Sequence, residues 1–130
     1  MTGDNSSRIN SDSLEDLLSA VRKFRDERDW SQFHTPKNLA AAIAIETSEL
    51  QECFLWKNDA EVESLLKDTE KCSAVEEEIA DVFLFTLLLS DRLNIDVGKA
   101  ILDKLHANAE KYPVKLARGN ARKYTELTDQ

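Results

Sequence analysis

The feature that most limits the fold is the scarcity of residues that break helices. Prolines occur only at Pro36 and Pro113, and Gly98 is the only glycine between them. Strand-rich domains need frequent turns, and turns draw heavily on glycine and proline. The apolar residues instead recur at steps of three and four, as a helix with one buried face requires. The sequence therefore predicts an all-α fold.

Periodicity and capping residues predict where the helices lie. Thr35 followed by Pro36 is a favourable N-cap and first helical residue, because the fixed φ of proline suits that position. Residues 57–72 are polar and read as a connecting segment, in which Asp59 is the expected start of any short helix. Four main helices are expected, over about 13–28, 36–56 and 73–93, and from a cap at Asn94 or Asp96 to just before Pro113.

The chain is long enough for one hydrophobic core. Its 130 residues suit a single domain, which we expect to span 13–112, with a flexible segment at 1–12 and a basic tail at 113–130. Association with further copies would enlarge the core. We therefore expect a bundle of four main helices that is completed by oligomerisation.

Charge and hydropathy argue against two classes of partner. The net charge of −8 disfavours general nucleic-acid binding, which depends on clustered lysine and arginine. The longest apolar stretch, 79–89, contains Asp81 and falls short of the roughly 20 residues of a membrane span. Cys53 and Cys72 form no CxxC or His-spaced pattern, and no secretory leader is evident. We expect a cytoplasmic protein that binds neither nucleic acid nor membrane.

The charge is unevenly distributed along the chain. Between Lys99 and Lys123 there are seven basic residues and two acidic ones, so this segment carries +5 and the remainder −13. An acidic body with a basic C-terminal quarter suits a small anion that is held through metal ions and covered by the cations.

Two pairs of acidic residues carry the strongest functional signal. Glu46 and Glu49 in IETSEL, and Glu78 and Asp81 in EIAD, are three residues apart, so each pair projects from one helix face with Cβ atoms about 5–6 Å apart. On antiparallel helices the pairs would converge into one cluster. Mutual repulsion would raise their pKa values unless divalent cations neutralised it. An all-oxygen ligand set favours a hard ion such as Mg²⁺.

The alternative interpretation is that these residues are solvated acids on amphipathic helices, as most acidic pairs are. Asp81 argues against it, because Phe85 and Leu88 continue the same face and the carboxylate prolongs an apolar stripe. Glu46 likewise follows the uncharged run LAAAIAI. Ionised groups beside apolar stripes require a partner, which a metal ion would supply.

Two further sets of side chains have spacings that fit a nucleotide. Trp56 is seven residues beyond Glu49, so on a continuous helix its indole would share that face about 10 Å further along. There it would either stack on a base or pack in the core, and the residues favour neither. Lys104, Asn108 and Lys111 share one face of the fourth helix. They either contact phosphate and sugar or form a solvated lysine face.

Motifs of several other enzyme classes are missing from the sequence. No Glu-x-x-His occurs, which argues against a metal-storing or redox carboxylate bundle. There is also no glycine-rich phosphate loop, no G-x-S-x-G and no plausible Cys–His nucleophile pair.

Three segments of the sequence together carry a family resemblance. They are HTPKNLAAAIAIETSELQECFLWK (34–57), EEEIADVFLFTLL (76–88) and YPVKLARGNARKYTEL (112–127). Together they resemble the MazG-like all-α nucleotide pyrophosphohydrolases, most closely the branch of dCTP pyrophosphatase 1. The resemblance implies hydrolysis of a nucleoside triphosphate between the α and β phosphates, with Mg²⁺ as cofactor and Mn²⁺ as its substitute. The products would be a monophosphate and pyrophosphate.

The resemblance also implies roles for individual residues. The metal-ligand motif of the family falls on Glu46, Glu49, Glu78 and Asp81, and one of the first two would also orient the attacking water. The substrate contacts of the family fall on Trp30, His34, Trp56, Lys104 and Asn108. Phe85 stands where this branch commonly has a tyrosine, so a preference for dCTP is left open. The basic tail would cover the polyphosphate.

The resemblance finally implies a biological setting. Its members remove surplus or damaged nucleotides, so the expected substrate is a dCTP-like or modified deoxynucleotide. The branch forms obligate oligomers, so a homo-oligomer is expected, either a dimer or a tetramer built as a dimer of dimers. The alternative is a catalytically silent interaction module with the same helical fold, against which the intact carboxylate pairs argue.

Overall fold

The computed structural model describes residues 13–128, which form helices and include no strand. The all-α prediction is confirmed. The chain divides into two units, Met1–Asn94 and Ile95–Gln130. The segment 1–12, predicted to be flexible, lies outside the described residues. Among the helices that are described, none is long and apolar enough to cross a membrane.

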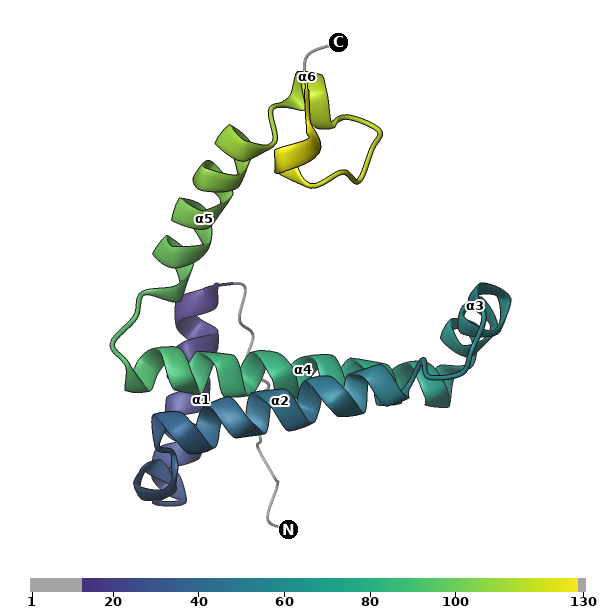
Figure 1. Cartoon of the computed structure of the whole chain (residues 1–130). Coiled ribbons are helices and arrows are strands. Elements are labelled where there is room, and N and C mark those ends of the chain that lie inside the picture. Colours follow the sequence, from purple (N-terminus) through teal and green to yellow (C-terminus); the bar gives the residue numbers. More distant parts are fainter. Residues whose placement is uncertain (1–12, 129–130) are drawn as a thin grey trace. The chain divides into compact units, whose positions relative to one another are not determined.

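The first unit is organised around its longest helix. It contains α1 (Leu14–Glu27), the 3₁₀ helix η1 (Ser31–Phe33), α2 (Pro36–Glu52), α3 (Asp59–Lys67) and α4 (Thr69–Arg92). Helices α2 and α4 run side by side in opposite directions (Figure 1) and share the most extensive contact, while α1 and α3 also pack on α4. Helix α4 is therefore the element that joins the others.

Short polar side chains set where these helices start. Each accepts a hydrogen bond from a backbone N–H of the first turn, which would otherwise lack a partner. These N-caps are Ser13, Thr35, Asn58 and Asp68. The predicted pairing of Thr35 with Pro36 at the start of α2 is confirmed, and so is a short helix that begins at Asp59.

Two predicted boundaries in this unit are wrong. Helix α2 ends at Glu52 and does not reach Trp56, because the chain turns at Cys53 and Trp56 takes a left-handed conformation with φ of 61°. Helix α4 begins at Thr69, ahead of the predicted Ser73, because the Asp68 side chain accepts the N–H of Lys71 and caps the helix there.

The second unit contains the fourth predicted helix and a folded tail. Its elements are α5 (Val97–Lys111), α6 (Val114–Ala117) and the 3₁₀ helix η2 (Tyr124–Glu126). Of the two predicted caps for α5, Asp96 is the one used. In the basic tail, the rings of Tyr112 and Tyr124 pack edge to face 6.0 Å apart, with the Lys111 ammonium 4.9 Å from the Tyr124 ring. These contacts fold the tail onto the end of α5.

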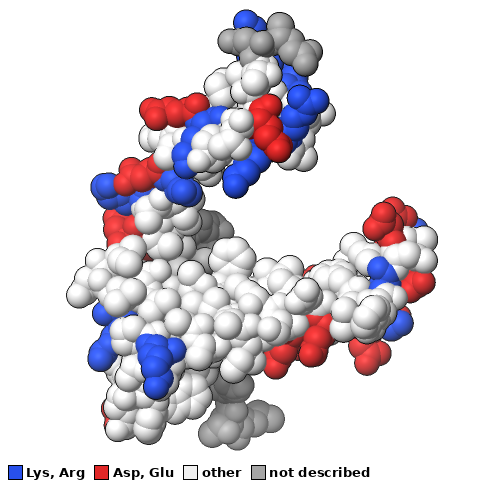
Figure 2. All heavy atoms as spheres, viewed as in Figure 1, with Lys and Arg blue, Asp and Glu red and all other residues white. Residues whose placement is uncertain are grey.

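The core of the chain is small. The buried apolar side chains among the described residues are Leu39, Leu65, Val75, Leu87 and Leu88. Several large apolar side chains lie in the open, including Phe83, which is 66 % exposed, and Ile45. Most of the α2 and α4 surface seen in Figure 2 is free of charged side chains. Exposed apolar side chains that form a contiguous patch on such a surface mark a site of association.

Neighbouring leucines of α3 allow a matched test of this packing. Leu65 is 7 % exposed and Leu66 is 48 % exposed. We expect Leu65→Ala to lower the free energy of unfolding by about 2–4 kcal/mol through lost burial and the cavity left behind. Leu66→Ala should cost less than about 1 kcal/mol. Urea unfolding followed by circular dichroism measures both, and equal losses would contradict the packing of α3 on α4.

Candidate metal centre

Helices α2 and α4 bring three carboxylates together. Glu46 and Glu49 come from α2 and Glu78 from α4, and one oxygen of each lies within 4.8 Å of the others. The antiparallel arrangement produces this meeting, since it sets the middle of α2 beside the first half of α4 (Figure 1). The predicted convergence of the acidic pairs is confirmed for these three residues.

The packing of α2 explains why Glu46 points inward. The positions of α2 up to Leu50 that are wholly or partly buried recur at steps of three and four, as one face of a helix does. They are Leu39, Ala42, Ile43, Glu46 and Leu50. Glu46 thus occupies a position in an otherwise apolar stripe, whereas Glu49 lies beside that stripe and is exposed.

Two carboxylate oxygens of the cluster lack the partner that burial requires. Oε2 of Glu46 and Oε2 of Glu78 are both buried and have no hydrogen-bond donor within the described part of the chain. An ionised carboxylate can only accept, and leaving it unpaired away from water is costly. The site therefore needs either a proton or a cation, and its oxygen-only donor set fits a hard divalent ion such as Mg²⁺.

The pKa of Glu46 reflects this need for a proton or a cation. Its pKa is raised from 4.5 to about 7, first by sharing a proton with Glu78, then by burial, and further by the negative charges of Glu49 and Asp81. A carboxyl group that is still protonated near pH 7 can exchange this proton for a bound cation. At pH 7 and without a bound ion, Glu46 is therefore protonated in part of the molecules.

Asp81 stands apart from the three converging residues. It lies on α4 one turn beyond Glu78 and is half-buried, but it is not a member of the group whose oxygens lie within 4.8 Å. Its charge nevertheless contributes to the raised pKa of Glu46. The role of Asp81 as a fourth ligand stays a prediction.

Trp30 and His34 form an aromatic pair just before α2. Their ring centroids are 6.5 Å apart, and Trp30 also meets Phe24 edge to face at 5.7 Å. Nδ1 of His34 is buried without a hydrogen-bond partner among the described residues. Burial lowers the pKa of His34, and the charge of Arg25 lowers it further, so this ring is neutral near pH 7.

The remaining predicted substrate contacts lie elsewhere. Trp56 follows α2 in a turn and is 91 % exposed, so the prediction that it shares a helix face with Glu49 is wrong, and so is the alternative that it packs in the core. Phe85 is half-buried on α4. Lys104 is exposed and Asn108 half-buried, and both lie on α5 in the second unit.

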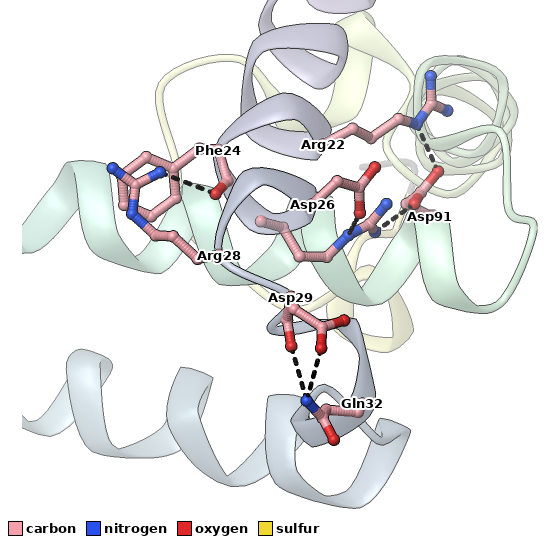
Figure 3. Close-up of polar contacts among 8 residues, drawn as sticks. Arg22, Phe24, Asp26, Arg28, Asp29, Gln32 and Asp91 are labelled. Atoms are coloured by element: carbon pink, nitrogen blue, oxygen red, sulfur yellow. Dashed lines mark hydrogen bonds and ion pairs between the residues drawn. The ribbon is translucent and has the colours of Figure 1, made fainter.

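Sequence reasoning missed one strongly bonded group, centred on Asp91 near the end of α4. Its carboxylate accepts hydrogen bonds from Arg22 and Arg25 of α1, each at 2.7 Å, and Figure 3 shows it facing Arg22. The available signals were an acid two residues after a long apolar run, and two arginines three residues apart in the first predicted helix. Neither feature identifies its partner without the fold.

Known proteins resemble the chain in both sequence and structure. The MazG-like family model matches residues 41–127. The dCTP pyrophosphatase 1 proteins of Rattus norvegicus and Homo sapiens are each 41 % identical over 114 residues, which cover 88 % of this chain and 67 % of each relative. A crystal structure of a pyrophosphatase from Archaeoglobus fulgidus superposes with a TM-score of 0.70 and 44 % identity, covering 76 % of this chain and 91 % of that one. The family match includes all three converging glutamates.

The raised pKa of Glu46 predicts how metal binding depends on pH. Glu46 must lose its proton to bind a cation, so Mg²⁺ affinity should increase as the pH rises from 6 to 8. Below pH 7 it should weaken by about tenfold per pH unit, with release of close to one proton per site. Isothermal titration calorimetry in buffers of different ionisation enthalpy measures both quantities.

Two variants make that experiment specific. Glu46→Gln removes the titrating group, so Mg²⁺ binding should weaken and lose its dependence on pH in this range. Glu77→Gln changes an exposed neighbour of Glu78 and should bind Mg²⁺ like the native chain. A native affinity that is flat between pH 6 and 8 would contradict the assignment.

Proposed function

Because the chain belongs to the MazG-like family, we propose that it is a nucleoside triphosphate pyrophosphohydrolase that requires Mg²⁺, for which Mn²⁺ substitutes. It hydrolyses the bond between the α and β phosphates and releases a monophosphate and pyrophosphate. The observation that carries the proposal is the meeting of Glu46, Glu49 and Glu78 within 4.8 Å. Such a set holds the hard divalent ions that accompany nucleotide phosphates.

The carboxylates divide the work of the reaction. Glu46, Glu49 and Glu78 hold the cation, and Asp81, one turn beyond Glu78, completes the ligand set. A divalent ion bound there lowers the pKa of a bound water and offsets the phosphate charge. Phosphoryl transfer asks little covalent chemistry of a protein, so the remaining task is to orient the water. Glu46 or Glu49 does this from α2.

The base of the nucleotide is recognised by aromatic side chains. Trp30 and His34 offer neighbouring rings 6.5 Å apart, against which the base lies. Phe85 contributes from α4. Stacking of a base on an aromatic ring contributes about 1–3 kcal/mol, so stacking on this pair supplies part of the free energy of nucleotide binding.

Trp56 supplies a further aromatic surface. Its indole is 91 % exposed, and its backbone has φ of 61°, a conformation that costs a bulky residue free energy. An exposed and strained tryptophan is typical of a residue that is covered on binding. We assign it to the nucleotide base, in place of the helix-face geometry that the sequence suggested.

The phosphate side of the substrate is assigned to the second unit. Lys104 and Asn108 on α5 contact phosphate and sugar, and the basic tail, 113–130, covers the polyphosphate. Lys115, Arg118 and other cations of this tail are exposed. Exposed cations are available to an anion that is drawn from solution.

The substrate class follows the relatives. Two of them are named dCTP pyrophosphatase 1, so we assign dCTP-like or modified deoxynucleotides, whose removal keeps the cytoplasmic nucleotide pool clean. Phe85 has no hydroxyl with which to bond a substrate. The loss of a hydrogen bond to the substrate changes selectivity more than it changes the rate of catalysis. Selectivity for the base is therefore the property that we expect to differ most from that of the relatives.

The active form is proposed to be a homo-oligomer, either a dimer or a tetramer built as a dimer of dimers. The support is the apolar surface of the single chain, in which Phe83, Ile45 and Leu105 are more than half exposed. Burial of such side chains against another copy is favourable by about 25 cal/mol per Å².

The proposal predicts release of pyrophosphate from a panel of canonical and modified nucleoside triphosphates. Activity should appear with Mg²⁺ or Mn²⁺ and vanish with EDTA. Asp81→Ala should lower kcat by about a hundredfold or more, whereas Glu77→Gln should stay within about twofold. A chain that binds Mg²⁺ but hydrolyses no member of the panel would be the catalytically silent interaction module.

Trp56 gives a separate prediction about affinity. Trp56→Ala should raise KM for the nucleotide by about tenfold with a smaller change in kcat, because a stacking contact is lost. Leu55→Ala, which removes a partly exposed apolar neighbour from the same turn, is the control. Equal effects of the two substitutions would exclude Trp56 from the binding site.

A further inference from the structure

Asp91, which lies outside the metal centre, accepts two short side-chain hydrogen bonds. Its Oδ1 accepts from Nε of Arg22 and its Oδ2 accepts from Nη1 of Arg25, both at 2.7 Å. The side chains of Asp91 and Arg25 are only 18 % and 14 % exposed. A carboxylate that is chelated in this way by two guanidinium groups fixes the helices that carry them. Asp91 therefore ties α1 to α4.

The positive charges of Arg22 and Arg25 offset the cost of burying the Asp91 carboxylate. Burial alone would raise the pKa of Asp91, but the hydrogen bonds and charges of Arg25 and Arg22 outweigh it and hold the pKa below its ordinary value. Arg25 also donates Nε to Asp26, on its solvent side, at 2.8 Å. Arg25 is thus bonded in two directions and has little freedom to move.

The backbone of Arg25 fixes the turn that leads to Trp30. The N–H of Trp30 donates to the carbonyl of Arg25, and the N–H of Asp29 donates to the carbonyl of Asp26, both at 3.1 Å. Asp29 has φ of 52°. A left-handed residue with these two hydrogen bonds is a Schellman motif, which ends a helix in one defined direction. The residue held by Asp91 is the one whose carbonyl anchors Trp30.

Side-chain contacts reinforce this turn. Trp30 packs edge to face on Phe24, which is the apolar contact that accompanies a Schellman motif. The Arg28 guanidinium lies 3.7 Å from the centre of the Phe24 ring. Gln32 donates its amide to both the backbone and the carboxylate of Asp29 (Figure 3). The position of the Trp30 indole is therefore set by the end of α1, and α1 is set by Asp91.

We propose that Asp91 is a positioning residue for base recognition: by anchoring Arg25 it fixes the turn that aims Trp30 and, through it, His34 at the nucleotide. This inference rests on the proposed function, which assigns Trp30 and His34 to the base. It separates two tasks along α4. Glu78 belongs to the metal centre in the first half, and Asp91 orients the aromatic pair from the last turn.

Fluorescence of Trp30 tests the positioning without any substrate. A Trp56→Phe background leaves Trp30 as the single tryptophan. In that background, Asp91→Asn should shift the emission of Trp30 to longer wavelength and raise its quenching by acrylamide. Lys23→Gln, which removes the exposed Lys23–Glu27 pair from the same helix, should change neither. Identical spectra for the two variants would overturn the inference.

Two more substitutions separate positioning from general stability. Arg25→Lys should disturb Trp30 more than Arg22→Lys, because only Arg25 also carries the carbonyl that accepts from Trp30. Equal disturbance would mean that Asp91 merely stabilises the α1–α4 contact, and the inference would fail. Asp91→Glu keeps the charge, and it should restore most of the native emission. If circular dichroism shows Asp91→Asn to be unfolded, Arg25→Lys replaces it in the comparison with the control.

Kinetics with both tryptophans present give the functional readout. Asp91→Asn should raise KM for the best nucleotide by about tenfold while kcat changes by less than about twofold, since binding geometry is lost and the chemistry is not. The Mg²⁺ concentration for half-maximal activity should not change. A fall in kcat with native KM would overturn the inference. Absence of turnover in the native chain would refute the proposed function alone, because the fluorescence result does not depend on it.

Discussion

The arrangement of the first unit depends on the burial of two carboxylate oxygens that have no hydrogen-bond donor among residues 13–128. Glu46 and Glu78 lie at the contact between α2 and α4, where a hydrogen bond with Glu78, burial and the negative charges of Glu49 and Asp81 raise the pKa of Glu46 to about 7. Apolar side chains in these positions would pack at lower cost. The acids make physical sense as the ligands of a cation, whose charge would also draw the two helices together.

Helix α4 connects this centre to the rest of the unit. It packs on α2 at the carboxylates, on α3 near its start and on α1 near its end. The contact with α1 includes the hydrogen bonds of Asp91, whereas the contact with α3 includes the buried Leu65. The chain has a small core and a large exposed apolar surface. Both features are consistent with a chain that completes its packing by binding other copies.

Much of the fold could be predicted from the sequence, because helix periodicity and N-caps are local signals. Thr35 with Pro36 and Asp96 were sufficient to start two helices. The end of α2 was missed because no glycine or proline stops it, and the left-handed Trp56 that completes the turn is rare for a bulky residue. The start of α4 was missed because Asp68 sits in a polar segment with several other acids.

The candidate site likewise contains features that the sequence predicted and features that it did not. The convergence of Glu46, Glu49 and Glu78 followed from spacing alone, once the helices were taken as antiparallel. The bonding of Asp91 to Arg22 and Arg25 joins residues far apart in the sequence, and no local pattern reports such a contact. Trp56 was assigned by counting along a helix that ends before it, so its role rests on exposure and strain.

The most direct test of the account is a crystal structure of the chain with Mn²⁺ and a nucleotide analogue that resists hydrolysis at the α–β bond. Anomalous scattering would locate the metal. The account predicts Mn²⁺ bound by carboxylate oxygens of Glu46, Glu49 and Glu78 and in contact with the analogue's phosphates, with the base against Trp30. Metal and phosphates bound at another place, with these three glutamates unliganded, would contradict it.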